Sequence, residues 1–149
     1  MKIWAFLTIF FLASAGTVFG LGPEDLLGLW KTDGDESKLE FFKCGDKICV
    51  KIAWLKEPNY TDRKEGPVGT PKVDRYNPNP ALRSRPLLGL QIMEGFTPTG
   101  SNHWDGGIIY NPENGKTYHG KLHLLAPDRL KLRGYIGISL IGGNEILTR

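Results

Sequence analysis

Long basic runs, low-complexity segments and internal repeats are all missing from this sequence of 149 residues. Its formal net charge is +3, or +2 without Lys2 (3 − 1), which is too mild to predict binding to nucleic acid or to an anionic membrane. It has only two cysteines, Cys44 and Cys49. Their C-x4-C spacing is not the C-x-x-C of redox and zinc sites.

Catalytic and metal-binding signatures are also missing. There is no G-x-S-x-G, no H-E-x-x-H and no phosphate loop. His103 and Asp105 would leave the same face of a strand, either as an acid–base pair or in a structural hydrogen bond. His119 and His123 lie four residues apart, about 13 Å along a strand, too far to share one ion. We therefore expect no catalytic residue, no metal and no cofactor.

The first 20 residues resemble a secretory signal. Lys2 precedes an apolar centre (IWAFLTIFFLA), and small residues follow at Ala13, Ala15 and Gly20. An uncleaved N-terminal anchor is the alternative. The signal predicts an exported chain with one domain over residues 21–149 and no membrane span after cleavage.

The segment KLEFFKCGDKICVKIAWL predicts a β-hairpin. Ile48, Val50, Ile52 and Trp54 alternate with other residues, which is the period of a strand with one apolar face. With Cys44 placed opposite Cys49, Phe41 faces Ile52, Leu39 faces Trp54, and both cysteines point outward. The register predicts a Cys44–Cys49 disulfide on the outer face, in an oxidising compartment.

Further strands are predicted at 28–33, 87–94, 103–110, 116–125, 129–137 and 138–148, separated by Gly/Pro/Asn turns. About eight short strands at this spacing indicate an all-β sandwich or barrel, and a closed barrel leaves no edge strand. Only the segment PEDLLGLW, which ends at Trp30, predicts a helix, because a proline in the first turn is followed by acidic residues. We expect a single eight-stranded antiparallel barrel with a short N-terminal helix and one long loop.

The motifs GLWKT, CGDKICVKIAWL, NPNPALRSRPLLGL, WDGGIIYNPENGKTY and LKLRGYIG together resemble a bacterial family of unknown function, number 2147. The resemblance implies an exported Gram-negative envelope protein with a lipocalin-like barrel, located in the periplasm or secreted, and no established activity. The chain departs from the family pattern at its end. The family pattern has a Gly-Arg-Thr type of turn and a late Trp in this region. This chain has Gly142, Gly143 and Asn144 at the turn and Leu147 in place of the Trp.

The long connection from Lys56 to Pro86 contains two guanidiniums, Arg83 and Arg85, in its proline-rich second half. Prolines restrict the chain, so this half is predicted to be a rigid loop at one end of the barrel. The arginines either donate to loop carbonyls and to Asp62 or Asp74, or reach a ligand head group at the barrel mouth.

The sequence favours a non-enzymatic barrel that binds a small hydrophobic or amphiphilic ligand, such as a fatty acid. The alternative is a periplasmic module with a filled core that meets a protein or glycan through its long loop. A hydrolase using His103 and Asp105 is least favoured. The candidate ligand-binding residues are Trp30, Phe41, Ile52, Trp54, Arg83, Arg85, Trp104, Tyr118, Leu122 and Leu132.

Overall fold

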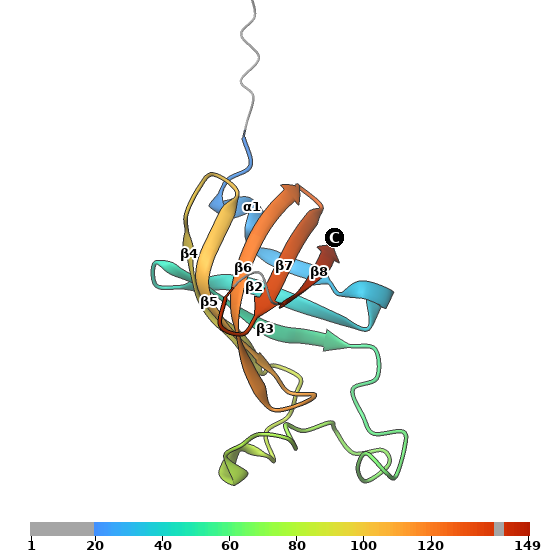
Figure 1. The fold of residues 1–149 in the computed structure, drawn as a ribbon. Coiled ribbons are helices and arrows are strands. Elements are labelled where there is room, and N and C mark those ends of the chain that lie inside the picture. Colours follow the sequence, from blue (N-terminus) through green and yellow to red (C-terminus); the bar gives the residue numbers. More distant parts are fainter. Residues whose placement is uncertain (1–19, 139–141) are drawn as a thin grey trace, which may run out of the picture.

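Eight antiparallel strands, each hydrogen-bonded to the next along the chain, close into a barrel (Figure 1). The computed structural model describes residues 20–138 and 142–149, so the predicted signal lies outside the described residues except for Gly20. The all-β barrel prediction is confirmed. The strands are β1 (Gly28–Lys31), β2 (Ser37–Cys44), β3 (Lys47–Leu55), β4 (Gln91–Pro98), β5 (His103–Asn111), β6 (Lys116–Ala126), β7 (Arg129–Tyr135) and β8 (Gly142–Thr148).

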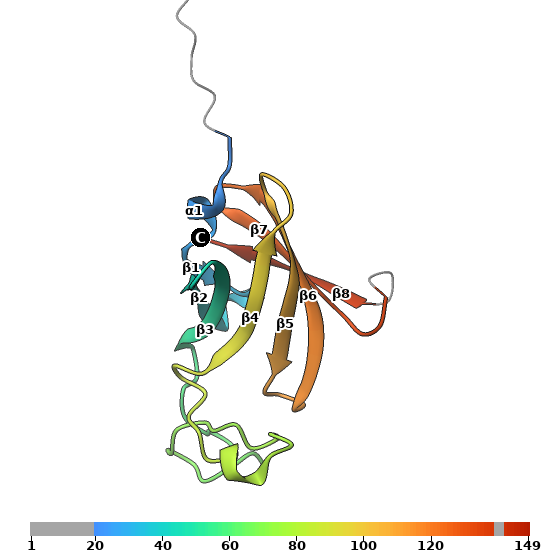
Figure 2. The same ribbon diagram turned by 90° about the vertical axis from the view of Figure 1, so that its left-hand side faces the viewer.

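The two ends of the barrel are built differently. The helix α1 (Pro23–Leu26) lies at one end, and the β3–β4 loop extends from the other (Figures 1 and 2). The β1–β2, β5–β6 and β7–β8 connections share the end of the β3–β4 loop, because consecutive strands run in opposite directions. Two short 3-10 helices, η1 (Asp33–Asp35) and η2 (Pro80–Leu82), belong to these connections. No helix in the described part of the chain is long and apolar enough to cross a membrane.

Alternate side chains of the strands point inward and form the core. Phe96 fits because two neighbours lack side chains: a Cβ at Gly107 would lie 2.1 Å from its ring, and one at Gly120 would lie 2.9 Å away. Burying a large apolar side chain stabilises the fold by about 1.5–3 kcal/mol. The core comprises Leu26, Trp30, Leu39, Phe41, Ile48, Val50, Ile52, Met93, Phe96, Trp104, Leu122, Leu124, Leu130, Leu132 and Leu147.

The first hairpin contains the predicted disulfide in a different register. Cys44 and Cys49 are bonded, with Cα atoms 5.8 Å apart. However, Cys49 pairs with Phe42, and Cys44 pairs with Lys47 across a tight turn, so the predicted pairing was wrong by two residues. Because strand side chains alternate with a period of two, this shift leaves the residues paired from Leu39 with Ile52 to Cys44 with Lys47 on their predicted faces.

Trp54 does not point into the barrel, and its predicted placement was wrong. Lys38 pairs with Trp54 and Leu39 with Ile52, so β3 carries one extra residue, Ala53, as a bulge. The bulge reverses the alternation, and Trp54 is 41% exposed, with the Lys38 Nζ 5.2 Å from the centre of its ring.

The strand predicted at 87–94 begins later, at Gln91, and continues to Pro98. Leu87 to Leu90 form a turn instead, in which the Leu90 N–H donates to the Leu87 carbonyl at 3.1 Å. Gly89 has a φ of 85°, a conformation that residues with side chains disfavour and that lies outside regular strand geometry. The strand therefore begins only after this glycine.

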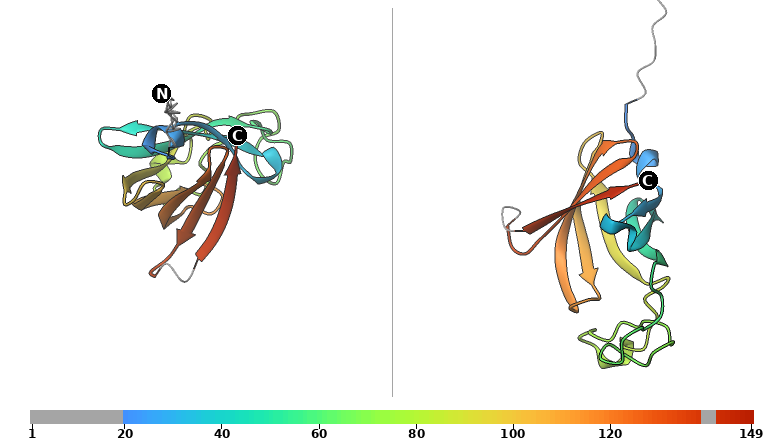
Figure 3. Two further views of the ribbon diagram at one scale, coloured as in Figure 1. Left: turned by 90° about the horizontal axis from the view of Figure 1, so that it is seen from above. Right: turned by 90° about the vertical axis from the view of Figure 1, so that its right-hand side faces the viewer.

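The barrel closes between its first and last strands over a short distance. Lys31 and Thr148 are the one pair recorded between the described parts of β1 and β8. Beside this seam, the Arg149 guanidinium stacks on the buried Trp30 at 4.1 Å and donates to the Asp25 and Leu27 carbonyls at 2.6 and 2.8 Å. The C-terminus therefore lies beside α1 (Figure 3). The Trp30 indole in turn donates to the Leu26 carbonyl at 2.8 Å.

The β3–β4 loop is fastened to the barrel by one buried carboxylate. Asp74 is fully buried and accepts hydrogen bonds from Arg85 at 2.7 Å, Asn77 at 2.8 Å and the Tyr110 hydroxyl on β5 at 2.5 Å. Burial raises the pKa of Asp74, but the three hydrogen bonds and the Arg85 charge outweigh it, so the pKa lies below 3.8. Burial and the Asp74 charge raise the pKa of Tyr110 to about 12.

Arg149→Ala removes the cation and both donors from the seam, and we expect it to lower the free energy of unfolding by about 1–2 kcal/mol. Arg149→Lys should recover only part of this loss, since one ammonium cannot stack and donate in the same geometry. Urea denaturation measures both, with the exposed Arg63→Ala as control. A loss no larger than that of Arg63→Ala would contradict the seam's role.

Asp74→Asn keeps the shape of the side chain but removes its charge and one acceptor. We expect a loss of about 2 kcal/mol in unfolding free energy and faster proteolytic cleavage between residues 56 and 90. Asp62→Asn, on the exposed part of the same loop, is the control. Unchanged cleavage in Asp74→Asn would show that the loop does not depend on this carboxylate.

The lowered pKa of Asp74 also predicts a pH dependence of stability. A carboxyl whose pKa falls on folding stabilises the protein above its unfolded value of 3.8, and this contribution is lost as the pH falls through the folded pKa. The difference in unfolding free energy between wild type and Asp74→Asn should therefore shrink below about pH 4. Denaturation between about pH 2 and pH 6 measures it, and a difference that grows toward low pH would contradict the assignment.

Candidate functional site

A cavity of about 600 Å³ opens at the end of the barrel that carries the β3–β4 loop. Residues of seven strands, β2 to β8, form its wall, and residues of the connecting loops form its rim. The apolar residues that line it are Leu39, Ile52, Leu55, Leu87, Ile92, Met93, Ile109, Pro112 and Leu132, joined by Tyr110 and Tyr118.

Two glycines help to keep this space open. Gly134 on β7 and Gly143 on β8 face each other across the ladder and both line the cavity. A Cβ at Gly134 would lie 3.7 Å from Ile109, an ordinary contact, and one at Gly143 would meet nothing within 4 Å. Larger side chains would therefore enter the cavity from these positions.

The predicted ligand-binding residues separate into groups. Ile52, Tyr118 and Leu132 line the cavity. The other inward residues are buried in the core and do not line it, and Trp30 and Phe41 pack edge to face with ring centres 6.4 Å apart. That group comprises Trp30, Phe41, Trp104 and Leu122, while Trp54 lies on the outside, as described above.

The two arginines lie in the loop and not at the cavity. The Arg83 Nε donates to the Asn77 carbonyl at 2.7 Å, and Arg85 is bonded to Asp74. These are the internal contacts of the first alternative drawn from the sequence. Neither arginine lines the cavity.

Acidic residues line the rim instead. Asp33 and Glu36 come from the β1–β2 connection, Glu113 from the β5–β6 turn, and Glu145 from β8. No Lys, Arg or His lies among the described residues that line the cavity. Glu36 is paired with Lys56 at 3.1 Å. The rim of the cavity therefore carries negative charge, although the net charge of the whole chain is positive.

Glu145 is the least exposed of these four acidic residues. It pairs with Leu132 across the β7–β8 ladder, so both side chains leave the same, inner face. Burial raises the pKa of the Glu145 carboxyl, a hydrogen bond from the Asp33 backbone lowers it, and the charges of Asp33 and Glu113 raise it again. The net pKa is above its usual value, as expected for a carboxylate without a cation beside it.

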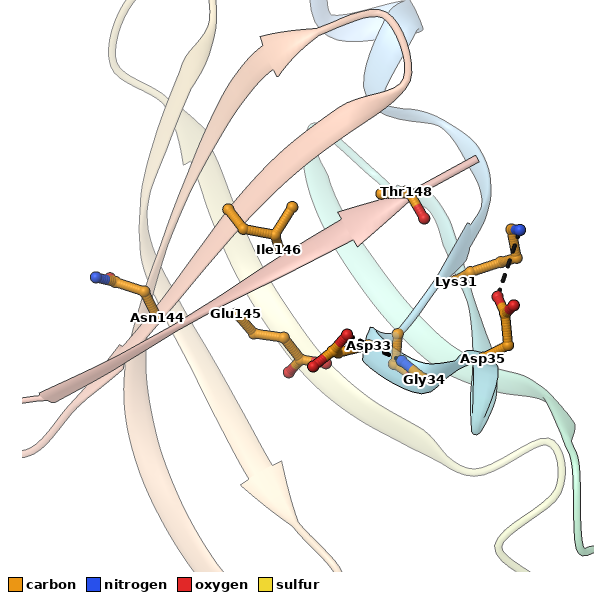
Figure 4. A pocket seen from close by; sticks show the side chains of 9 residues that line it. Lys31, Asp33, Gly34, Asp35, Asn144, Glu145, Ile146 and Thr148 are labelled. Carbon is orange, nitrogen blue, oxygen red and sulfur yellow. Dashed lines mark hydrogen bonds and ion pairs between the residues drawn. The ribbon is translucent and has the colours of Figure 1, made fainter.

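A second cavity of about 600 Å³ lies at the seam between η1 and β8 (Figure 4). It shares Thr32, Asp33, Asn144 and Glu145 with the first cavity. Figure 4 shows the Asp33 and Glu145 side chains meeting there, while Lys31 is turned away to pair with Asp35 at 3.3 Å. The two carboxyl groups thus lie where the interior meets a lateral opening in the barrel wall.

The acidic rim was not predicted from the sequence. Glu145 and Leu147 share the period-two pattern of the last strand, and this pattern was the available signal. The connections that bring Asp33 and Glu113 beside Glu145 come from distant parts of the chain, so their meeting was not readable from any one segment.

His103 and Asp105 have separate partners. His103 stacks on His123 across the β5–β6 ladder with ring centres 3.9 Å apart, and Asp105 pairs with Lys121 at 3.2 Å. Burial and the charges of His103 and Lys131 lower the pKa of His123. Within the described residues, no group of three or more His, Cys, Asp or Glu side chains is arranged to hold a metal ion.

Comparisons with known proteins agree with this architecture. A solved structure, protein HP1028 from the human pathogen Helicobacter pylori, is similar with a TM-score of 0.69 and 25% identity, over 83% of this chain and 82% of that one, and is described as belonging to the lipocalin family. No curated protein matches. The model of the family "Uncharacterized protein conserved in bacteria (DUF2147)" matches residues 28–149. The chain therefore belongs to the DUF2147 family, and its barrel is lipocalin-like.

Proposed function

We propose that this protein is a non-enzymatic carrier or receptor that holds a small hydrophobic or amphiphilic ligand in its barrel. The observation that carries the proposal is the apolar cavity of about 600 Å³ at the open end. Small-molecule sites are mostly apolar hollows of about 300–1,000 Å³ with a few polar groups, and this cavity fits that description.

The location proposed for this function is the periplasm of a Gram-negative bacterium, or the outside of the cell. The signal-like first 20 residues and the Cys44–Cys49 disulfide support it, since disulfides persist in oxidising compartments.

The alternative, a module that meets a protein or glycan, draws support from the β3–β4 loop. Val68, Tyr76 and Leu88 are large apolar side chains of this loop that are about half exposed. The alternative assumed a filled barrel, however, and the cavity favours ligand binding over it.

Filling the cavity should abolish binding without unfolding the barrel. We expect Gly134→Leu to weaken binding of N-phenyl-1-naphthylamine, an apolar dye uncharged at neutral pH, by at least about tenfold, because the new side chain occupies the space of the dye. Dye fluorescence measures the affinity, and circular dichroism with thermal melting checks the fold.

Gly100→Leu adds the same volume in the β4–β5 turn, where the nearest atom to a Cβ would be His103 at 3.9 Å, and serves as the matched control. Gly143→Leu is a second cavity-filling variant should Gly134→Leu not fold. Absence of dye binding to the wild type, or equal binding to folded cavity-filling variants and the control, would contradict the proposal.

A further inference from the structure

The polar end of the ligand can be inferred from the charges around the cavity. A fatty acid would bring a carboxylate to a rim that carries Asp33, Glu113 and Glu145 and, among the described residues, no basic side chain. Like charges in a partly dehydrated site repel, and a buried carboxylate without a cationic partner is costly. The cavity is therefore poorly suited to the ligand class that the sequence first suggested.

Five basic side chains near this end of the barrel already have partners, and one of them, Arg133, donates to the Asn144 Oδ1 at 2.9 Å beside the cavity. Arg85 is bonded to Asp74, and the Arg83 guanidinium donates to the loop backbone. Lys56 is paired with Glu36 and Lys31 with Asp35. Releasing any of them toward a ligand would break an existing contact, so they do not offset the acidic rim.

Glu145 is placed to meet a head group. It leaves the same face as Leu132, which lines the apolar wall, and its carboxyl lies beside Asp33 at the lateral opening (Figure 4). An apolar chain lying along Leu132, Ile109 and Tyr118 would thus end close to both carboxyl groups. The cavity thus has an apolar interior that ends at two acidic side chains.

We propose that the ligand is a cationic amphiphile, with its apolar chain in the barrel and an ammonium head group between Asp33 and Glu145. This inference rests on the proposed ligand-binding function and names the class of ligand. An ammonium ion supplies a positive charge and further donors to both carboxylates, and the lateral opening leaves its remaining protons hydrated.

The test compares three probes with the same chain, n-dodecylamine, 1-dodecanol and dodecanoate, by isothermal titration calorimetry at neutral pH and below their micelle concentrations. We expect the amine to bind at least about tenfold more tightly than dodecanoate, with dodecanol between them. Added NaCl should weaken binding of the amine and leave that of dodecanol nearly unchanged, because salt screens only the charged pair.

Substitution of the carboxylates locates the head group. Glu145→Gln and Asp33→Asn should each weaken amine binding several-fold, leave dodecanol binding unchanged and improve dodecanoate binding. Glu94→Gln is the matched control, since Glu94 is exposed on β4 and does not line the cavity.

The outcomes separate this inference from the proposed function. Dodecanoate binding as tightly as the amine, or amine binding that Glu145→Gln and Asp33→Asn leave intact, would overturn the inference while ligand binding itself stands. Failure of all three probes and of N-phenyl-1-naphthylamine would overturn both.

Discussion

Closure of the sheet between β1 and β8 is the constraint on which this structure depends. An eight-stranded barrel needs its first and last strands to meet, yet the described residues record one pair there, Lys31 with Thr148. Side-chain contacts supplement the short ladder, because Arg149 covers the buried Trp30 and donates to two carbonyls around α1. One end of the seam is thus closed by a cation and an aromatic ring.

The other end of the same seam stays open. Beyond Lys31 the chain turns into η1, so β8 continues without a β1 partner and the lateral cavity forms between them. Glu145 and Asp33 meet in this gap, and burial raises the pKa of Glu145. An ionised carboxyl group in a setting that disfavours its charge lowers the stability of the folded protein, and such local costs are common at functional sites.

The β3–β4 loop influences the net charge at the mouth of the cavity indirectly, because it engages two arginines in its own contacts. Asp74 draws Arg85 into a buried cluster with Tyr110 and Asn77, while Arg83 bonds to the backbone. Two cations that could have faced the cavity are instead bonded within the loop, and the hydrogen bond from Tyr110 to Asp74 joins the loop to β5. The rim is left to Asp33, Glu113 and Glu145, and this division of charges distinguishes the cavity from one built for carboxylates.

The sequence by itself determined the all-β barrel, the disulfide partners and the inward residues Ile52, Tyr118 and Leu132, because period-two alternation and turn residues are local properties of a strand. It did not determine the side on which Trp54 lies, because a bulge at Ala53 reverses the alternation. Nor did it reveal the partner of Arg85 or the meeting of Asp33 with Glu145. Arg85 and Asp74 lie in one loop, and the packing of Asp74 against Tyr110 on β5 places it beside Arg85. Asp33 and Glu145 lie far apart in the chain, and only the closing of the barrel brings them together.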